Sequence, residues 1–170
     1  MNIEDIEGVK SLLALPKKIA IIPHKNPDGD AMGSTLGLSH YLTLKGHSAT
    51  VITPNEFPDF LAWLPGSETV KVFEKEKDHV TRILEEADII FTLDFNHFGR
   101  TGEQMEDVLR KLDTTFIMID HHQKPDSYAK YTFSDTSYGS TCEMVYKMIH
   151  HFLIQAMAQR AKWCIILLPA

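Results

Sequence analysis

Residues 18 to 30 read Lys-Ile-Ala-Ile-Ile-Pro-His-Lys-Asn-Pro-Asp-Gly-Asp, and this stretch is the most informative one for the fold. Its first half, up to Pro23, is a short apolar run that predicts a buried strand. Its second half places His24, Asp28 and Asp30 within one loop. An imidazole and two carboxylates directly after a buried strand suit Mn²⁺, Fe or Zn²⁺. The alternative is a Pro-Asp-Gly turn with solvated carboxylates, and the loop alone does not separate the two.

A second polar cluster follows another apolar run. Asp94 comes directly after Ile-Ile-Phe-Thr-Leu, so its carboxylate is expected at the end of a strand. A carboxylate in that position can bridge two metal ions, whereas the alternative is an aspartate that caps a helix or a turn. His97, three residues further on, is interpreted as a loop or surface residue rather than a ligand.

The third cluster is Asp120-His121-His122, directly after the apolar run 115–119. One histidine can bind metal, and its neighbour can contact a phosphate oxygen or serve as a general acid. Asp120 can orient a histidine as a supporting partner. The alternative is an exposed polar turn after a strand.

Strands alternate with helices along the chain, which predicts βαβ units in a mainly parallel sheet. We therefore expect a doubly wound α/β fold with about five strands and helices on both faces. Ligands bind outside the carboxyl ends of the strands in such sheets, so the three clusters are expected to converge. The expected strands are 18–23, 48–53, 69–73, 88–93, 115–119 and 129–134, and the expected helices are 3–14, 31–45, 78–86, 102–111 and 139–151.

The composition narrows the function classes. The chain has 170 residues, 44% of them hydrophobic, enough for one domain with a real core. A net charge of -6 argues against binding long duplex nucleic acid, but bound cations would still admit a small phosphorylated substrate. Cys142 and Cys164 predict two reduced thiols rather than a disulfide. With no signal peptide, and with the run 163–168 too short to span a bilayer, we expect a cytoplasmic protein without a membrane partner.

Three motifs occur in a familiar order: His24-Lys-Asn-Pro-Asp-Gly-Asp-Ala-Met-Gly-Ser34, Leu93-Asp94-Phe-Asn96 and Ile119-Asp120-His-His122. Together they resemble the DHH phosphoesterases. The resemblance is strongest to the oligoribonuclease and pAp phosphatase branch, which is nano-RNase-like and often labelled exopolyphosphatase-related. It covers residues 1–150, which we expect to form the catalytic domain.

The resemblance implies a binuclear Mn²⁺ site and assigns a role to each candidate residue. His24 and Asp28 would hold one metal, Asp30 and His121 the other, and Asp94 would bridge them. His122 would contact the scissile phosphate, with Asp120 supporting the histidine pair, while a metal-activated water attacks phosphorus. Gly33 and Ser34 are expected in the first turn of the following helix, where free backbone N–H groups favour an anion.

The sequence departs from the family in two places. The family's fourth motif carries another metal-binding Asp after the helix that begins near Gly139, but the last aspartate here is Asp135, before that helix. The family's C-terminal substrate-binding domain, with its Gly-Gly-Gly-His-type motif, is also missing. Residues 151–170 form an atypical tail, which a truncation, a frameshift or a sequence error explains better than a natural one-domain variant. Its apolar end, residues 164–168, is expected to supply a sheet strand or else to be exposed.

Three functions remain open at this point. The first is a metal-dependent phosphoesterase that hydrolyses short oligoribonucleotides and pAp, impaired in this form by the missing Asp and domain. The second is a pyrophosphate or polyphosphate hydrolase of the same fold, and the third is an inactive metal- or nucleotide-binding remnant. Asn26-Pro27 and Asp94-Phe-Asn96 favour the nucleotide branch. The expected partners are short RNA or a small phosphorylated nucleotide, and a homo-oligomer is left open.

Overall fold

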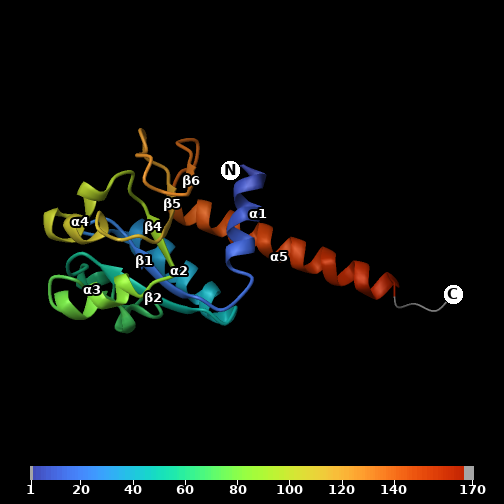
Figure 1. Cartoon of the computed structure of the whole chain (residues 1–170), viewed down its shortest axis with the longest axis horizontal. Helices are drawn as coiled ribbons and strands as arrows, with labels where there is room; N and C mark the ends of the chain where they lie inside the picture. Colours follow the sequence, from blue (N-terminus) through green and yellow to red (C-terminus); the bar gives the residue numbers. More distant parts are fainter. Residues whose placement is uncertain (1, 167–170) are drawn as a thin grey trace.

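A six-stranded parallel sheet forms the centre of the molecule in the part that the computed structural model describes, which is the backbone of residues 2–166 and the side chains of residues 2 and 4–153. The strand order is β3-β2-β1-β4-β5-β6, and every neighbouring pair is parallel (Figure 1). The strands are β1 (Lys18–Ile22), β2 (Ser48–Thr53), β3 (Lys71–Val72), β4 (Ile89–Leu93), β5 (Thr115–Asp120) and β6 (Tyr131–Ser134).

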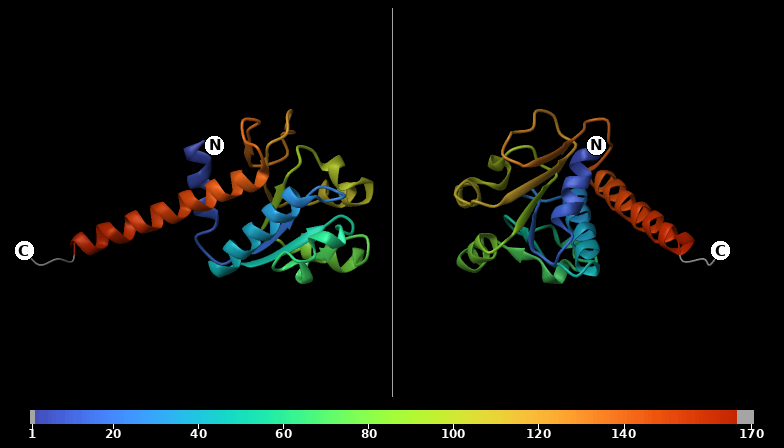
Figure 2. Two further views of the ribbon diagram at one scale, coloured as in Figure 1. Left: turned by 180° about the vertical axis from the view of Figure 1, so that it is seen from behind. Right: turned by 45° about the vertical axis from the view of Figure 1, so that its right-hand side comes forward.

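Helices cover both faces of this sheet (Figure 2). One face packs against α1 (Ile3–Leu12), α2 (Gly29–Leu44) and the start of α5 (Thr141–Ile166). The other packs against α3 (Lys77–Glu85) and α4 (Glu103–Leu109). Short 3₁₀ turns complete the connections as η1 (Asp59–Leu61), η2 (Ser67–Thr69) and η3 (Phe98–Thr101). The arrangement is the doubly wound α/β fold that the alternating pattern predicts.

Strand β1 shows why these sequences read as continuous apolar runs. Ile19 and Ile21 belong to the core under α2, while Ala20 and Ile22 belong to the core under α3 and α4. Successive side chains of a strand point to opposite faces, so a strand covered on both faces needs apolar residues at every position. Strand β4 is buried along its whole length for the same reason.

The order in which strands join the sheet changes side between β1 and β4, and this point positions the site. From β1 the chain continues to β2 and β3 on one side, then returns to β4 and continues to β5 and β6 on the other. Ile22 pairs with Thr92, so the loops after β1 and β4 leave the sheet side by side at its carboxyl edge. This switch point is where doubly wound sheets bind ligands.

The predicted elements agree with the structure in type and order, several are shorter than predicted, and three differences affect the sheet, the site or the tail. The sheet has six strands rather than about five, because the short edge strand β3 and the outer strand β6 both pair. Helix α2 begins at Gly29, two residues before the predicted start, because Asp28 caps it. Helix α5 continues past its predicted end near residue 151 and runs to Ile166, since no Gly or Pro in that stretch ends it.

The extended α5 corrects the expectation for the tail. Residues 164–166 are helical, so they supply no strand to the sheet, and residues 167–168 lie outside the described part. The exposure of side chains beyond residue 153 also lies outside it. Among the helices that the structure describes, none combines the length and apolarity needed to cross a membrane.

Candidate metal centre

The three polar clusters meet at the carboxyl edge of the sheet, with Asp94 in the middle. Its Oδ2 lies 3.6 Å from Nε2 of His24, and its Oδ1 lies 3.5 Å from Nε2 of His121. His24 follows β1 and His121 follows β5, about 100 positions later in the sequence. Both lie beside the carboxylate of Asp94, which follows β4. The expected convergence of the three loops is present.

Asp94 is held in this position by its backbone and by two hydrogen bonds. Its φ of 66° lies in the left-handed region, which is uncommon for a residue other than glycine and is found at functional sites. Its amide donates to the carbonyl of Ile119 at 3.0 Å, and its Oδ1 accepts from Oγ1 of Thr141 at 2.8 Å. The side chain is almost fully buried, so the carboxylate is fixed before any ligand arrives.

His24 presents one defined ring nitrogen to Asp94. Its Nδ1–H donates to the carbonyl of Lys25 at 2.8 Å, because a carbonyl can only accept, and this leaves Nε2 facing the carboxylate. Such a backbone bond is the usual way a metal-binding histidine is oriented. The hydrogen bond to Asp94 raises the pKa of His24 although burial opposes it. Burial raises the pKa of Asp94, but the bonds from His24 and Thr141 outweigh it and lower this pKa overall.

Asp28 completes a first group of ligand-type atoms. It is the N-cap of α2, and its Oδ1 accepts from the amides of Asp30 and Ala31 at 2.9 and 3.0 Å. One ligand-type atom from each of His24, Asp28 and Asp94 lies within 4.8 Å of the others. The assignment in which His24 and Asp28 hold one metal and Asp94 is shared needs these three residues to be neighbours, and it remains a prediction.

A second group consists of Asp94, His121 and His122, also within 4.8 Å of one another. Nδ1 of His122 lies 2.7 Å from Oδ1 of Asp120, a fully buried carboxylate. The other oxygen of Asp120 has no hydrogen-bond partner. Asp120 therefore orients His122, which is the supporting position expected for it. The catalytic roles of the two residues remain predictions.

Asp30 lies beside the second group but is engaged by α5. Its Oδ2 accepts from the amide of Thr141 and its Oδ1 from the amide of Cys142, both at 2.8 Å. Nε2 of His121 lies 3.8 Å from its Oδ2. Asp30 and His121 are therefore neighbours, as a shared metal would require, and the assignment of Asp30 as a ligand remains a prediction. Burial raises the pKa of the neighbouring Cys142 thiol to about 12, and the nearby carboxylates of Asp30, Asp94 and Asp28 raise it further.

The expected place of Gly33 and Ser34 in the first turn of the helix is wrong, and their phosphate contacts stay a prediction. Because α2 starts at Gly29, these residues lie in its second turn, where backbone N–H groups are used within the helix. Ser34 is buried, and its hydroxyl donates to the carbonyl of Ala31 at 3.2 Å. A Cβ on Gly33 would come within 2.9 Å of Sγ of Cys142, so this glycine allows α2 and α5 to approach closely.

Two asparagines connect the loops of the site. Asn26, in the left-handed region with φ 56°, donates its amide to Oδ1 of Asn55 at 2.7 Å and accepts from Nδ2 of Asn55 at 2.8 Å. Nδ2 of Asn96 donates to the carbonyl of Gln123 at 2.7 Å, which joins the loops after β4 and β5. The motif asparagines thus fix loop geometry. His97 is exposed, as expected.

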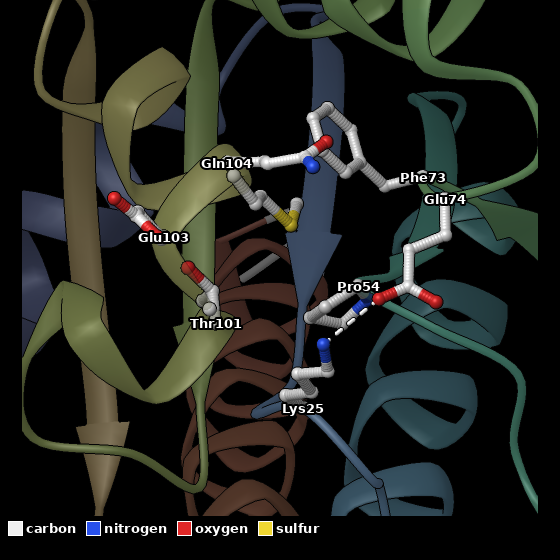
Figure 3. Close-up of a pocket in the computed structure, with 9 residues that line it drawn as sticks. Lys25, Pro54, Phe73, Glu74, Thr101, Glu103 and Gln104 are labelled. Atoms are coloured by element: carbon white, nitrogen blue, oxygen red, sulfur yellow. Dashed lines mark hydrogen bonds and ion pairs between the residues drawn. The ribbon is translucent and has the colours of Figure 1, made fainter.

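Lys25 belongs to the first motif but points into a separate pocket of about 210 Å³ (Figure 3). Its Nζ lies 2.8 Å from Oε1 of Glu74, and Phe73, Thr101 and Gln104 form other parts of the wall. None of the candidate metal ligands lines this pocket. Lys25 is therefore assigned to the rim of the site rather than to the metal centre.

Sequence reasoning missed Thr141 and Asn55. A threonine at the start of a helix reads as a simple cap, and an asparagine among prolines reads as a loop residue. Their roles depend on partners 47 and 29 positions away, which no local pattern records. Asp135 lies outside both groups of ligand-type residues, and its Oδ1 accepts from the amide and hydroxyl of Ser137 in its own turn.

Comparisons with known proteins agree with this geometry. The family model described as "DHH family, N-terminal domain" matches residues 18–167. The chain is 29% identical over 140 residues to the "Probable bifunctional oligoribonuclease and PAP phosphatase NrnA" of Streptococcus mutans, an alignment that covers 80% of this chain and 40% of the relative. It is 28% identical over 112 residues to a "Probable manganese-dependent inorganic pyrophosphatase" of Lactococcus lactis, covering 62% of this chain and 32% of the relative.

A solved structure also resembles this chain. An exopolyphosphatase-related protein from Bacteroides fragilis superposes with a TM-score of 0.85 and 37% sequence identity, covering 87% of this chain and 43% of that chain. The chain therefore spans well under half the length of these relatives.

Proposed function

The chain belongs to the DHH family, and from this premise we propose that it is the metal-binding catalytic part of a phosphoesterase acting on short oligoribonucleotides and pAp. The observation that carries the proposal is Asp94, a buried carboxylate shared by two groups of ligand-type residues. Two triads that meet at one carboxylate suit a pair of divalent cations that share a ligand.

The donor set supports divalent cations, for which we propose Mn²⁺. Imidazole nitrogens and carboxylate oxygens in mixture suit Mn²⁺, Fe and Zn²⁺. A relative described as manganese-dependent favours the first. His24, Asp28 and Asp94 would hold one cation, and Asp94, His121 and Asp30 the other. Bound cations would supply Lewis acidity, which stabilises charge on a phosphoryl group and acidifies water.

His122 is the residue placed to handle a proton or a phosphate oxygen. It is about half exposed, and Asp120 holds its Nδ1 at 2.7 Å. Because Nδ1 is used by that buried carboxylate, Nε2 is the ring nitrogen left for substrate. We propose that His122 contacts the scissile phosphate or its leaving oxygen through Nε2.

The nucleotide substrates rest on resemblance to the oligoribonuclease and PAP phosphatase relative and on two motif asparagines. Asn26 and Asn96 build the loops around the metal groups through the bonds described above. The second candidate function is pyrophosphate hydrolysis, because one relative is named a pyrophosphatase. The third is an inactive metal-binding remnant, which would bind the cations without hydrolysing any of these substrates.

Substrate profiling of the purified chain tests the proposal. We expect Mn²⁺-dependent release of phosphate from pAp and of mononucleotides from a diribonucleotide. His122→Ala serves as the inactive control, since it should keep Mn²⁺ but lose turnover. Hydrolysis of pyrophosphate alone would favour the second candidate. Mn²⁺ binding without turnover of any of these substrates would favour the third.

A further inference from the structure

Thr141, at the start of α5, contacts two of the site's carboxylates at once. Its hydroxyl donates to Oδ1 of Asp94 and its amide donates to Oδ2 of Asp30, each at 2.8 Å. The residue is completely buried. We propose that Thr141 is a positioning residue of the metal centre, which sets the orientation of the Asp94 carboxylate. This inference rests on the proposed function only in taking the centre to bind divalent cations.

A capping role does not explain the hydroxyl of Thr141. The neighbouring Ser140 already caps α5, since its Oγ accepts from the amide of Glu143 at 3.1 Å. In an N-cap the side-chain oxygen accepts a hydrogen bond from the first turn of its own helix. The Thr141 hydroxyl instead donates across the molecule to a carboxylate 47 positions away. The Ser140 hydroxyl therefore caps α5, whereas the Thr141 hydroxyl binds Asp94.

The bond determines which oxygen of Asp94 faces which group. Oδ1 accepts from Thr141 and lies 3.5 Å from Nε2 of His121, while Oδ2 lies 3.6 Å from Nε2 of His24. The strained backbone of Asp94 fixes where the side chain starts, and the threonine bond fixes how its carboxylate plane is turned. Without that bond, the side chains left beside the carboxylate are the imidazoles of His24, His121 and His122, which belong to the two groups of ligand-type residues themselves.

Helix α5 can hold the hydroxyl in place because it is locked to α2. The amides of Thr141 and Cys142 clasp both oxygens of Asp30, which belongs to the first turn of α2. The missing Cβ of Gly33 gives Cys142 the space to approach. These contacts hold the first turn of α5 against the first turn of α2, which begins directly after Asp28 and contains Asp30. Partners that orient ligands in this way change metal affinity by about 10–100-fold when removed.

Replacement of Thr141 tests the proposal through metal binding. The comparison uses Thr141→Val, which keeps the shape and removes the hydroxyl, and Thr141→Ser, which keeps the hydroxyl. Mn²⁺ affinity is measured by isothermal titration calorimetry on the whole chain, alongside the melting temperature in excess EDTA. We expect Thr141→Val to bind Mn²⁺ about 10-fold more weakly or worse, and Thr141→Ser to stay within about threefold of the unchanged chain.

Two control variants separate positioning from stability. Ser140→Ala removes the cap of the same helix, and Thr35→Val removes a fully buried hydroxyl that donates to the carbonyl of Ala31 at 2.8 Å. Both should lower the melting temperature by a few degrees and leave Mn²⁺ affinity unchanged. Equal affinity of Thr141→Val and the unchanged chain overturns the proposal, as does an equal loss in either control. A chain that binds Mn²⁺ but hydrolyses nothing refutes the proposed activity alone, and one that binds no Mn²⁺ refutes both proposals.

Discussion

The two halves of the metal centre are built in different ways. In the first half, His24 and Asp28 are oriented by their immediate neighbours, the carbonyl of Lys25 and the first amides of α2. In the second half, His122 is oriented locally by Asp120, but Asp30 is held by α5, more than 110 positions away. Asp94 belongs to both halves and takes one partner from each, His24 and Thr141.

The difference indicates which half of the metal centre can form its geometry without contacts from distant parts of the chain. A loop whose ligands are fixed by local bonds forms its geometry whenever β1 and α2 form. A group that depends on α5 forms its geometry only when that helix is correctly packed against α2. We therefore expect the first half to bind metal more tightly than the second.

Asp94→Asn should have the largest effect, because it removes the charge that both halves share. Asparagine tolerates the left-handed backbone at this position and can still accept from Thr141, so the fold should survive. We expect Mn²⁺ affinity to fall at least 100-fold in both halves and hydrolysis to disappear. Calorimetric titration with Mn²⁺ measures this, with circular dichroism as the check on folding. Retention of one tight Mn²⁺ would show that the halves do not share Asp94.

His24→Ala and His121→Ala should separate the halves. His24 is a buried member of the first group, and His121 is a more exposed member of the second. We expect His24→Ala to remove the tighter Mn²⁺ and His121→Ala to remove only the weaker one. Counting bound Mn²⁺ by electron paramagnetic resonance distinguishes the two results. The reverse order of loss would contradict the contrast drawn between the halves.

The same contrast explains how much the sequence could predict. The strands, the doubly wound fold and the convergence of His24, Asp94 and His121 follow from apolar runs that end in polar residues, because period and topology are local or general rules. The engagement of Asp30 by α5 does not follow, since it depends on the crossing of two helices. Ser34 was misplaced because the Asp28 cap starts α2 early, and small boundary errors change which N–H groups are free.

Asp120→Asn should act on turnover rather than on metal binding. Asp120 holds His122 through Nδ1, and asparagine cannot stabilise a protonated imidazole as a carboxylate does. We expect kcat for pAp to fall about 10- to 100-fold while Mn²⁺ affinity stays within about threefold. Steady-state kinetics in saturating Mn²⁺ provide the measurement, and calorimetry provides the control. A loss of the second Mn²⁺ would instead place His122 among the ligands.

The metal-free chain should show a pH dependence from the first half. The pKa of His24 is raised from 6.5 and the pKa of Asp94 is lowered from 3.8, each through their contact. The pair therefore stabilises the fold fully between about pH 3.8 and pH 6.5. This stabilisation is lost as pH rises through the raised pKa of His24 or falls through the lowered pKa of Asp94. Thermal unfolding in EDTA measures it, and His24→Gln should abolish the alkaline loss of stability; an unchanged profile in that variant would contradict the assignment.

Lys25→Met should have the smallest effect on Mn²⁺ affinity, and it tests whether the Lys25 side chain belongs to the first half of the metal centre. Although Lys25 lies between His24 and Asn26, its ammonium pairs with Glu74 in the neighbouring pocket at 2.8 Å (Figure 3). Both partners are substantially exposed, and such pairs contribute about 1 kcal/mol or less. Only the Lys25 carbonyl orients His24, and the substitution leaves it in place. We expect Mn²⁺ affinity within about twofold of the unchanged chain, measured by calorimetry, with Glu74→Gln as the matched variant. A 10-fold loss in Lys25→Met but not in Glu74→Gln would show that the lysine side chain belongs to the metal centre after all.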